Sequence, residues 1–158
     1  MLEIKVKYHV EGLEKITKIE KGDWIDLRSA YDYYIEEGEF CLIDLGISVK
    51  IPKGYEMNIV PRSSTFKNYG IIQTNHFGIV DESYSGNGDI IKMPVYCLKG
   101  MSAETTKGGL DPQKYSMIKK NDRICQFRIT EKMPEISIIE VDNMEDESRG
   151  GFGSTGVQ

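Results

Sequence analysis

Short runs of strand-forming residues, separated by frequent turn residues, are the feature that most constrains the fold of this chain. From Leu2 to Val10 apolar and polar residues alternate, which is the period of a strand with one buried face. Turn clusters such as Pro52–Gly54 and Ser85–Gly88 separate the later runs. The later predicted strands are Phe40–Ile43, Gly46–Ile51, Tyr55–Val60, Ile71–Thr74, Ile90–Leu98, Arg123–Thr130 and Glu135–Val141. Many short strands with little helix between them predict an all-β sandwich or a closed barrel of antiparallel sheet.

Three segments depart from this strand pattern. A short helix is expected at Thr65–Tyr69, where Ser63 and Ser64 offer capping hydroxyls and Gly70 can end the helix. The segment Lys99–Tyr115 is rich in Gly, Thr, Lys and Ser, which predicts an exposed excursion between two strands. The tail is acidic and then rich in glycine, so it is expected to be mobile when nothing holds it.

Composition narrows the class of protein. The 158 residues suit one domain, and a net charge of -5 without a long Lys and Arg run argues against polymeric nucleic acid as a partner. No apolar stretch has the length of a membrane span, and the N-terminus lacks the layout of a signal peptide. Cys41, Cys97 and Cys125 are widely spaced in apolar runs, which predicts buried free thiols in a reducing cytoplasm. Two histidines are too few for a His-based metal cage.

The segment Pro61–Ser64 could bind an anion. It places the guanidinium of Arg62 beside two hydroxyls at the start of the short helix, and such a group matches phosphate or carboxylate. The simpler interpretation is a capped helix with a solvated Arg. Taken alone, the segment favours that simpler interpretation.

The segment Gly78–Gly86 places Asp81 directly after an apolar run, followed by Tyr84 and a glycine turn. A carboxylate in this position could hold a water molecule, and the ring could pack against a ligand. An ordinary hairpin would produce the same pattern. The hairpin is the simpler interpretation of the segment by itself.

Two further segments carry polar groups near the end of the chain. In Asn121–Phe127 polar and apolar residues alternate, so Gln126 could contact a ligand or simply belong to the solvent-exposed face of a strand. In Arg149–Gly156 six glycine or hydroxyl residues surround one Phe, a composition that suits a phosphate cradle because glycine lets backbone N–H groups approach an anion. A disordered tail is the alternative for this last segment.

In their order along the chain these four segments, with Gly22–Ala30 ahead of them, resemble the five sequence motifs of the trimeric dUTPase family. The resemblance runs from Gly22 to Gly156, and it places Gly-Gly-Phe-Gly-Ser-Thr-Gly at the C-terminal end as that family does. Pro-Arg-Ser and Gly-x-x-Asp-x-x-Tyr, together with Asp-Arg-Ile-x-Gln and the tail, form a very specific set. The resemblance implies a jelly-roll-like β-barrel with one short helix, a barrel domain at 1–141 and a mobile arm at 142–158 that closes over the active site.

The resemblance implies hydrolysis of dUTP to dUMP and pyrophosphate by attack of water on the α-phosphate, which limits uracil in DNA and supplies dUMP. Asp81 would orient and deprotonate that water, and Tyr84 would pack against the deoxyribose. Asn75, three residues before Gly78, would read uracil together with the backbone. The substrate-binding residues that the resemblance implies are Arg62, Ser63, Ser64, Asn75, Gly78, Ile79, Val80, Tyr84, Gln126, Phe152, Gly153, Ser154 and Thr155.

Within that set, Ser63 would meet the bridge between the α- and β-phosphates, and Gln126 would contact a phosphate. In the arm, Phe152 would stack on uracil, Ser154 and Thr155 would bind the γ-phosphate, and Arg149 would act in catalysis by countering developing charge. Asp122 and Arg123 would be structural partners.

The resemblance also implies Mg²⁺ as cofactor, a homotrimer with active sites at subunit interfaces, and a cytoplasmic location. Asp26 would act on the magnesium through water, because Mg²⁺ keeps several waters and is held largely by substrate phosphates. Arg149 directly precedes Gly150-Gly151, whereas many members have one or two residues between, so its reach differs from the family pattern. Two other functions fit the fold: a dCTP deaminase, which lacks the glycine-rich tail, and a non-catalytic nucleotide-binding regulatory protein.

Overall fold

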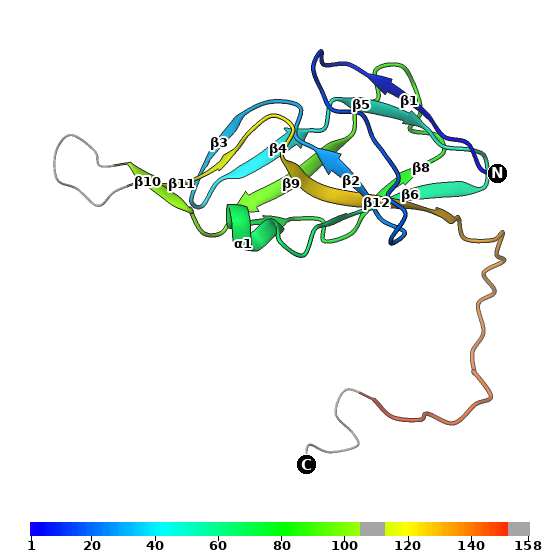
Figure 1. Ribbon diagram of the computed structural model, residues 1–158. Helices are drawn as coiled ribbons and strands as arrows, with labels where there is room; N and C mark the ends of the chain where they lie inside the picture. The colour runs from blue at the N-terminus through cyan, green and yellow to red at the C-terminus, as the bar shows by residue number, and fades with distance from the viewer. Residues whose placement is uncertain (105–112, 152–158) are drawn as a thin grey trace.

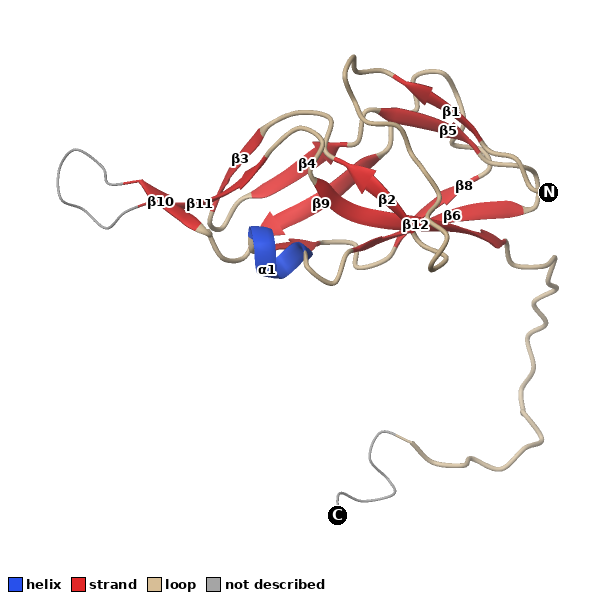
Figure 2. Ribbon diagram, viewed as in Figure 1, coloured by secondary structure: helices blue, strands red, loops and turns tan. Residues whose placement is uncertain are grey.

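The computed structural model describes residues 1–104 and 113–151, and within them the chain forms twelve strands and one helix (Figure 1). The elements, in chain order, are β1 Lys5–Tyr8, β2 Ile25–Arg28, β3 Tyr33–Glu36, β4 Phe40–Asp44, β5 Ile47–Lys50, β6 Tyr55–Pro61, α1 Thr65–Tyr69, β7 Ile71–Gln73, β8 Gly78–Asp81, β9 Lys92–Cys97, β10 Ser102–Glu104, β11 Gln113–Ile118 and β12 Arg123–Glu131. The expected all-β class with one short helix is confirmed (Figure 2).

All strand pairs are antiparallel, and the described strands form four short sheets rather than one continuous closed sheet. The largest sheet has the order β2-β12-β6-β8, and the others are β4-β9-β7, β10-β11-β3 and β1-β5. The longest strand, β12, lies between β2 and β6. It therefore brings the first motif and the segment after β6 to the same part of the molecule.

One core holds the sheets together. Inward side chains at alternating strand positions are completely buried, among them Met57 on β6, Met93 and Val95 on β9, and Phe127 on β12. A β-bulge lies between Arg123 and Cys125, where the pairing of β12 with β2 shifts. Such a bulge re-aims the neighbouring side chains, and here Arg123 is exposed beside the buried Ile124.

Helix α1 has the predicted bounds, and its C-terminus is fixed by Gly70. This residue has φ 64°, and an added Cβ would lie 1.7 Å from the carbonyl oxygen of Lys99. The predicted hydroxyl cap is wrong in its detail. Ser64 occupies the N-cap position but its side chain makes no capping bond, whereas Thr65 Oγ1 accepts a hydrogen bond of 2.9 Å from the backbone N–H of Arg62.

Two sequence predictions about strands are wrong. Glu135–Val141 forms no strand, and its side chains are exposed, including Ile138 at 91% and Ile139 at 77%. The segment expected as an excursion contains β10 and part of β11, which pairs with β3 and buries Ser116 and Ile118. Residues 105–112 of that segment lie outside the described residues.

After β12 the chain leaves the body of the molecule, and residues 133–151 are exposed (Figure 1). The three cysteines are free thiols: Cys97 and Cys125 are buried as predicted, while Cys41 is half-buried. Burial raises the pKa of all three thiols. In the part of the chain that the structure describes, no helix is long and apolar enough to cross a membrane.

Candidate functional site

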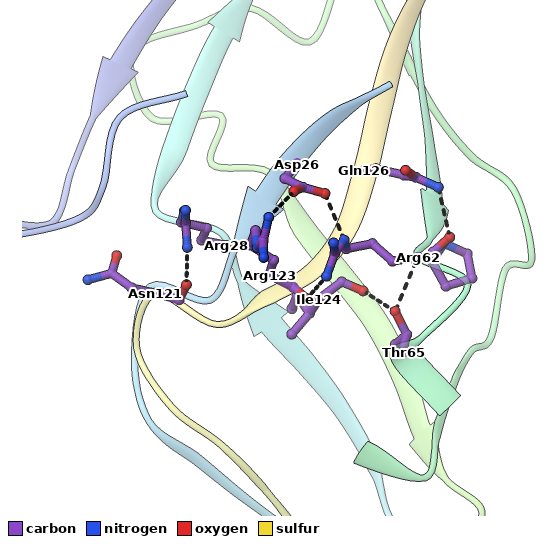
Figure 3. Close-up of polar contacts among 9 residues, drawn as sticks. Asp26, Arg28, Arg62, Thr65, Asn121, Arg123, Ile124 and Gln126 are labelled. Atoms are coloured by element: carbon purple, nitrogen blue, oxygen red, sulfur yellow. Dashed lines mark hydrogen bonds and ion pairs between the residues drawn. The ribbon is translucent and has the colours of Figure 1, made fainter. Parts of the chain in front are cut away.

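Asp26 on β2 is the centre of an ion-paired cluster at one end of the largest sheet (Figure 3). Its Oδ1 lies 2.7 Å from Nε of Arg62, and its Oδ2 lies 3.1 Å from Nη1 of Arg123. The two arginines come from the ends of neighbouring strands, β6 and β12, and one carboxylate therefore fixes both. The side chains of Asp26 and Arg62 are 29% and 26% exposed, so solvent and a ligand can still reach them.

The strand register explains why these segments meet. Gln126 lies opposite Asp26 on one side of β12 and opposite Val60 on the other. Its Nε2 donates a hydrogen bond of 3.4 Å to the carbonyl oxygen of Pro61 (Figure 3). Arg62 and the strand residues Asp26 and Gln126, which the sequence placed in three separate motifs, are thus brought together by backbone pairing.

Thr65 links the start of the helix to β12 and is only 1% exposed. Its Oγ1 accepts from the N–H of Arg62 and donates to the carbonyl oxygen of Ile124, at 2.9 Å and 2.7 Å. The Arg62 backbone is therefore positioned by a buried hydroxyl, and Ser63 and Ser64 follow Arg62 in the chain before the helix begins.

Asp122 has a structural role in the turn before β12. Its Oδ2 accepts from the N–H of Lys119 at 2.9 Å, and its carbonyl accepts from Ser29 at 3.0 Å. The pKa of the Tyr69 hydroxyl is raised by burial and then by the neighbouring Asp122 carboxylate. Asp122 is thus a turn-forming residue, while Arg123 belongs to the Asp26 cluster.

Asp81 ends β8 at the start of an exposed turn. Its Oδ1 accepts hydrogen bonds from both the hydroxyl and the backbone N–H of Ser83. These two bonds, the hydroxyl first, lower the pKa of the Asp81 carboxyl. Among the residues described, no side chain forms a hydrogen bond or ion pair with Oδ2 of Asp81, and this exposed carboxylate is accessible to a ligand or to water.

Glu82 anchors this turn to the rest of the sheet. Its Oε2 accepts from the backbone N–H of Gly54, and its Oε1 lies 2.7 Å from Nζ of Lys132, just beyond the end of β12. The Lys132 bond first and the Gly54 bond second lower the pKa of Glu82. Both oxygens of the Glu82 carboxylate therefore have partners within the protein. Glu82 is less able than Asp81 to bind a water molecule or a ligand.

A cavity of about 420 Å³ opens beside Asp81. It is lined by Ile79, Val80, Asp81, Tyr84, Ile90, Ile91 and Lys92. The ring of Tyr84 is held in place because its hydroxyl donates to the carbonyl oxygen of Ile90 at 3.2 Å. The turn and the start of β9 thus place a carboxylate, an aromatic ring and a lysine around one opening.

A second, smaller cavity of about 80 Å³ adjoins the first and shares Ile79, Val80 and Lys92 with it. It is lined by Ile59, Gln73, Asn75, Gly78, Ile79, Val80, Lys92, Met93 and Pro94. Gly78 is buried, and a Cβ added there would lie 3.3 Å from Cβ of Ile59, so glycine allows β8 to approach β6 closely. Asn75 and residues 78–80 therefore line one pocket, and their part in base recognition stays a prediction.

The Asp26 cluster and the Asp81 turn lie at opposite ends of β6. Asp81 pairs with Glu56, whereas Pro61, next to Arg62, is five residues further along the same strand. At the rise of an extended strand this separation is roughly 17 Å. One chain alone therefore does not bring the Asp81 carboxylate into a cleft with Arg62 and Ser63.

The C-terminal motif is described only in part. Arg149 is exposed and lies on the segment that leaves the body of the molecule. The predicted ligand contacts at Phe152, Gly153, Ser154 and Thr155 fall outside the described residues.

The described side chains form no direct protein cage for a magnesium ion. In residues 1–104 and 113–151 no group of three or more His, Cys, Asp or Glu side chains could hold a metal ion. Both oxygens of Asp26 are paired with guanidinium groups, so direct ligation by Asp26 would break those pairs. These residues fit a magnesium ion that keeps its waters and is held by phosphates.

Sequence reasoning missed several residues that shape the site. They are Thr65, Gln73, Glu82 and Lys132. A polar residue inside an apolar run was the available signal for Gln73, which directly follows Ile71 and Ile72. The pairing of Glu82 with Lys132 spans fifty residues and has no local signature in the sequence.

The sequence of this chain is similar to a family model and to named relatives. The family model described as dUTPase matches residues 18–101, more than half of the chain. The SPbeta prophage-derived deoxyuridine 5'-triphosphate nucleotidohydrolase of Bacillus subtilis (strain 168) is 48% identical over 157 residues, covering 99% of this chain and 100% of that protein. The deoxyuridine 5'-triphosphate nucleotidohydrolase of Finegoldia magna is 37% identical over 137 residues, covering 84% of this chain and 83% of that protein.

Solved structures share the fold at lower identity. The dUTPase of Staphylococcus bacteriophage 80alpha, described with dUpNHpp, gives a TM-score of 0.77 at 20% identity and covers 98% of this chain and 99% of that one. The dUTPase from phage phi11 of S. aureus, described with a structural Mg(II) ion, gives a TM-score of 0.71 at 18% identity and covers 91% of this chain and 99% of that one. With the matched family model and the two relatives above 30% identity, this chain belongs to the dUTPase family.

Proposed function

We propose that this chain hydrolyses dUTP to dUMP and pyrophosphate, and so limits uracil incorporation into DNA and supplies dUMP. The structural observation that carries the proposal is the Asp81 carboxylate, which has one free oxygen and lines a cavity of about 420 Å³ together with Tyr84. Membership of the dUTPase family identifies the substrate.

In the proposed reaction, Oδ2 of Asp81 accepts a proton from a water molecule as that water attacks the α-phosphorus. A new P–O bond forms, the bond from the α-phosphorus to the bridging oxygen breaks, and pyrophosphate leaves with the bond's electrons. Ser83 holds Oδ1, so the free oxygen keeps a fixed direction. A positioned carboxylate of this kind acts as a general base.

Arg62, Ser63, Ser64 and Gln126 are the proposed phosphate contacts. Arg62 supports this role because Asp26 and the Thr65 hydroxyl fix its side chain and backbone without burying it. A guanidinium held in this way is already oriented for phosphate oxygens, which reduces the entropy lost on binding.

The base and sugar contacts are proposed for the two cavities beside β8. Tyr84 would pack against the deoxyribose, where a 2′-hydroxyl would have no room. Asn75 and the backbone of Gly78, Ile79 and Val80 would read the polar edge of uracil. The closeness of Gly78 to Ile59 keeps this pocket narrow.

We infer that the complete site forms between copies of the chain in a homotrimer. The separation of Asp81 from Arg62 along β6 supports this, because a second copy can supply the distant half. The outer face of the β4-β9-β7 sheet also supports it. There Phe40 and Leu42 are 59% and 50% exposed, and Phe40 and Ile72 are both paired with Tyr96, so an apolar face is available to another copy.

We propose that residues 1–141 act as the β-barrel domain and residues 142–158 as an arm that closes over the site. The exposed path of 133–151 away from the body supports an arm. On the arm, Arg149 would counter developing charge, Phe152 would stack on uracil, and Gly153, Ser154 and Thr155 would bind the γ-phosphate. Removing residues 150–158 should sharply reduce turnover and leave the assembly folded.

Magnesium is the proposed cofactor, brought to the site with the triphosphate. When bound, it would neutralise phosphate charge, and Asp26 would reach it through water. The pairing of Asp26 with two arginines supports an indirect role. The free cysteine thiols support a cytoplasmic location.

Release of pyrophosphate from dUTP, UTP, dTTP and dCTP, measured on the full chain, tests the proposed function. Rapid release from dUTP with slow release from the other three is expected. Ammonia production from dCTP would instead indicate a deaminase. Binding of dUTP without any turnover would indicate a nucleotide-binding regulatory protein.

A further inference from the structure

Gln73 is a polar side chain in an apolar environment beside the smaller cavity. It is 3% exposed and follows Ile71, which is 1% exposed, on β7. Its Oε1 is buried and has no hydrogen-bond partner among the residues described. Burial of an amide whose oxygen has no partner costs free energy. The presence of this amide in the core therefore requires an explanation, and its two hydrogen bonds supply one.

The hydrogen bonds of Gln73 fix the orientation of two amides in succession. Its Nε2 lies 3.1 Å from the carbonyl oxygen of Ile59, and a backbone carbonyl can only accept. The atom facing Ile59 must therefore be the nitrogen. The same nitrogen lies 2.9 Å from Oδ1 of Asn75, so both of its hydrogens are in use and the Asn75 atom facing it must be an acceptor. This leaves Nδ2 of Asn75 turned away from Gln73.

We propose that Gln73 is a specificity-determining positioning residue: it prevents the Asn75 amide from flipping, so that Asn75 presents an N–H donor to the pyrimidine. This inference rests on the proposed function. A free asparagine can rotate its amide and match either a donor or an acceptor. Uracil carries a carbonyl oxygen at position 4, which accepts, whereas cytosine carries an amino group, which donates. A fixed donor therefore favours dUTP and disfavours dCTP.

The packing around Gln73 prevents it from releasing Asn75. A Cβ added at Gly78 would lie 3.4 Å from Nε2 of Gln73 and 3.3 Å from Cβ of Ile59. The backbone of β8 therefore lies directly against the Gln73 amide, and β6 supplies the carbonyl on the other side. Any rotation of Gln73 would leave the Ile59 carbonyl without its hydrogen bond or press against β8.

The test is the ratio of kcat/KM for dUTP to kcat/KM for dCTP in the full-length enzyme. Gln73→Met fills a similar volume and cannot donate to Asn75, so the ratio should fall by about tenfold or more as Asn75 becomes free to flip. Gln73→Glu offers only acceptors when ionised, which favours Nδ2 of Asn75 facing inward. This variant should lower the ratio further, with a gain in turnover of dCTP relative to Gln73→Met.

Asn75→Asp provides a second test that leaves the buried Gln73 unchanged. The carboxylate can still accept from Gln73 but presents no donor, so the ratio should also fall. Thr74→Val is the matched control, since Thr74 is exposed and adjoins both residues, and the ratio should stay at the wild-type value. Thermal unfolding of each variant identifies any that fail to fold.

The outcomes separate the two proposals. A wild-type enzyme that releases no pyrophosphate from dUTP overturns the proposed function itself. A wild-type enzyme that prefers dUTP, with equal losses for dUTP and dCTP in Gln73→Met, overturns only the role of Gln73, because a merely structural defect lowers both rates alike. An unaltered ratio in Asn75→Asp overturns it as well, even if both Gln73 variants fail to fold.

Discussion

Asp26 and Asp81 belong to two ends of the same sheet, and their carboxylates have opposite surroundings. Both oxygens of Asp26 are held by guanidinium groups, at 2.7 Å from Arg62 and 3.1 Å from Arg123. Asp81 is exposed, and only its Oδ1 is held, by the hydroxyl and N–H of the neighbouring Ser83. One carboxylate joins three strands, whereas the other is fixed by its own turn.

This difference indicates which carboxylate can act on water. A general base needs a free lone pair within hydrogen-bond reach of the proton that it takes. Oδ2 of Asp81 meets this condition, since no side chain in the described part of the chain pairs with it and the residue is exposed. Asp26 instead neutralises and orients two cations, which is a positioning role.

Replacing Asp81 with Asn should have the largest effect. The amide keeps the shape of the carboxyl but cannot accept the proton, so kcat for dUTP should fall by about 10²- to 10⁴-fold while dUTP still binds. Pyrophosphate release gives kcat, and calorimetric titration gives the dissociation constant. Asp23→Asn, an exposed Asp near the start of β2, is the control. Undiminished turnover in Asp81→Asn would exclude Asp81 as the base.

Thr65→Val, a change beside the Asp26 cluster, should have the next largest effect. It should lower the stability of the protein. The Val side chain has nearly the same shape but leaves the Arg62 N–H and the Ile124 carbonyl without the buried hydroxyl that they share. The free energy of unfolding should fall by about 1–3 kcal/mol. Urea denaturation measures this, with the exposed Thr74→Val as a matched control. Equal stabilities of the two variants would show that the hydroxyl does not hold the Arg62 turn.

Asp26→Asn should have a smaller effect, because its partners are partly exposed. The side chains of Arg62 and Arg123 are 26% and 51% exposed, so solvent screens the two ion pairs. The free energy of unfolding should fall by about 1 kcal/mol, and less at high salt. Its kcat should fall far less than that of Asp81→Asn. A loss of kcat equal to that in Asp81→Asn would remove the distinction between a positioning and a reacting carboxylate.

Strands were predicted correctly where apolar and polar side chains alternate. They were predicted poorly where a strand forms only because another strand pairs with it. The runs that became β4, β5, β6, β9 and β12 carry apolar residues that reach the core. Glu135–Val141 is also rich in Ile and Val, but no strand lies beside it. The tendency of such residues to form a strand depends on a neighbouring strand against which they can pack. By contrast, β11 begins with the polar residues Gln113 and Lys114, and it forms a strand because β3 pairs with it.

The candidate site shows the same limit. The motif residues could be named from the sequence, and backbone pairing brings Asp26, Arg62 and Gln126 together. The order of the motifs does not reveal that Asp81 lies at the other end of β6, because that distance depends on the register of β6 with β8 and β12.

Ser83→Ala should have the smallest effect, and its sign follows from the pKa of Asp81. The Ser83 hydroxyl is the largest cause of the lowered pKa, so its removal should raise that pKa toward its usual range. A base acts when ionised, and kcat/KM for dUTP is lost as pH falls through its pKa. The acidic limb of the pH profile should therefore move to higher pH in Ser83→Ala, while the rate at neutral pH changes little because Asp81 is ionised there in both proteins. Ser83→Thr keeps the hydroxyl and should keep the wild-type profile. A shift to lower pH in Ser83→Ala, or the same profile in all three proteins, would mean that Asp81 is not the group whose ionisation limits the reaction.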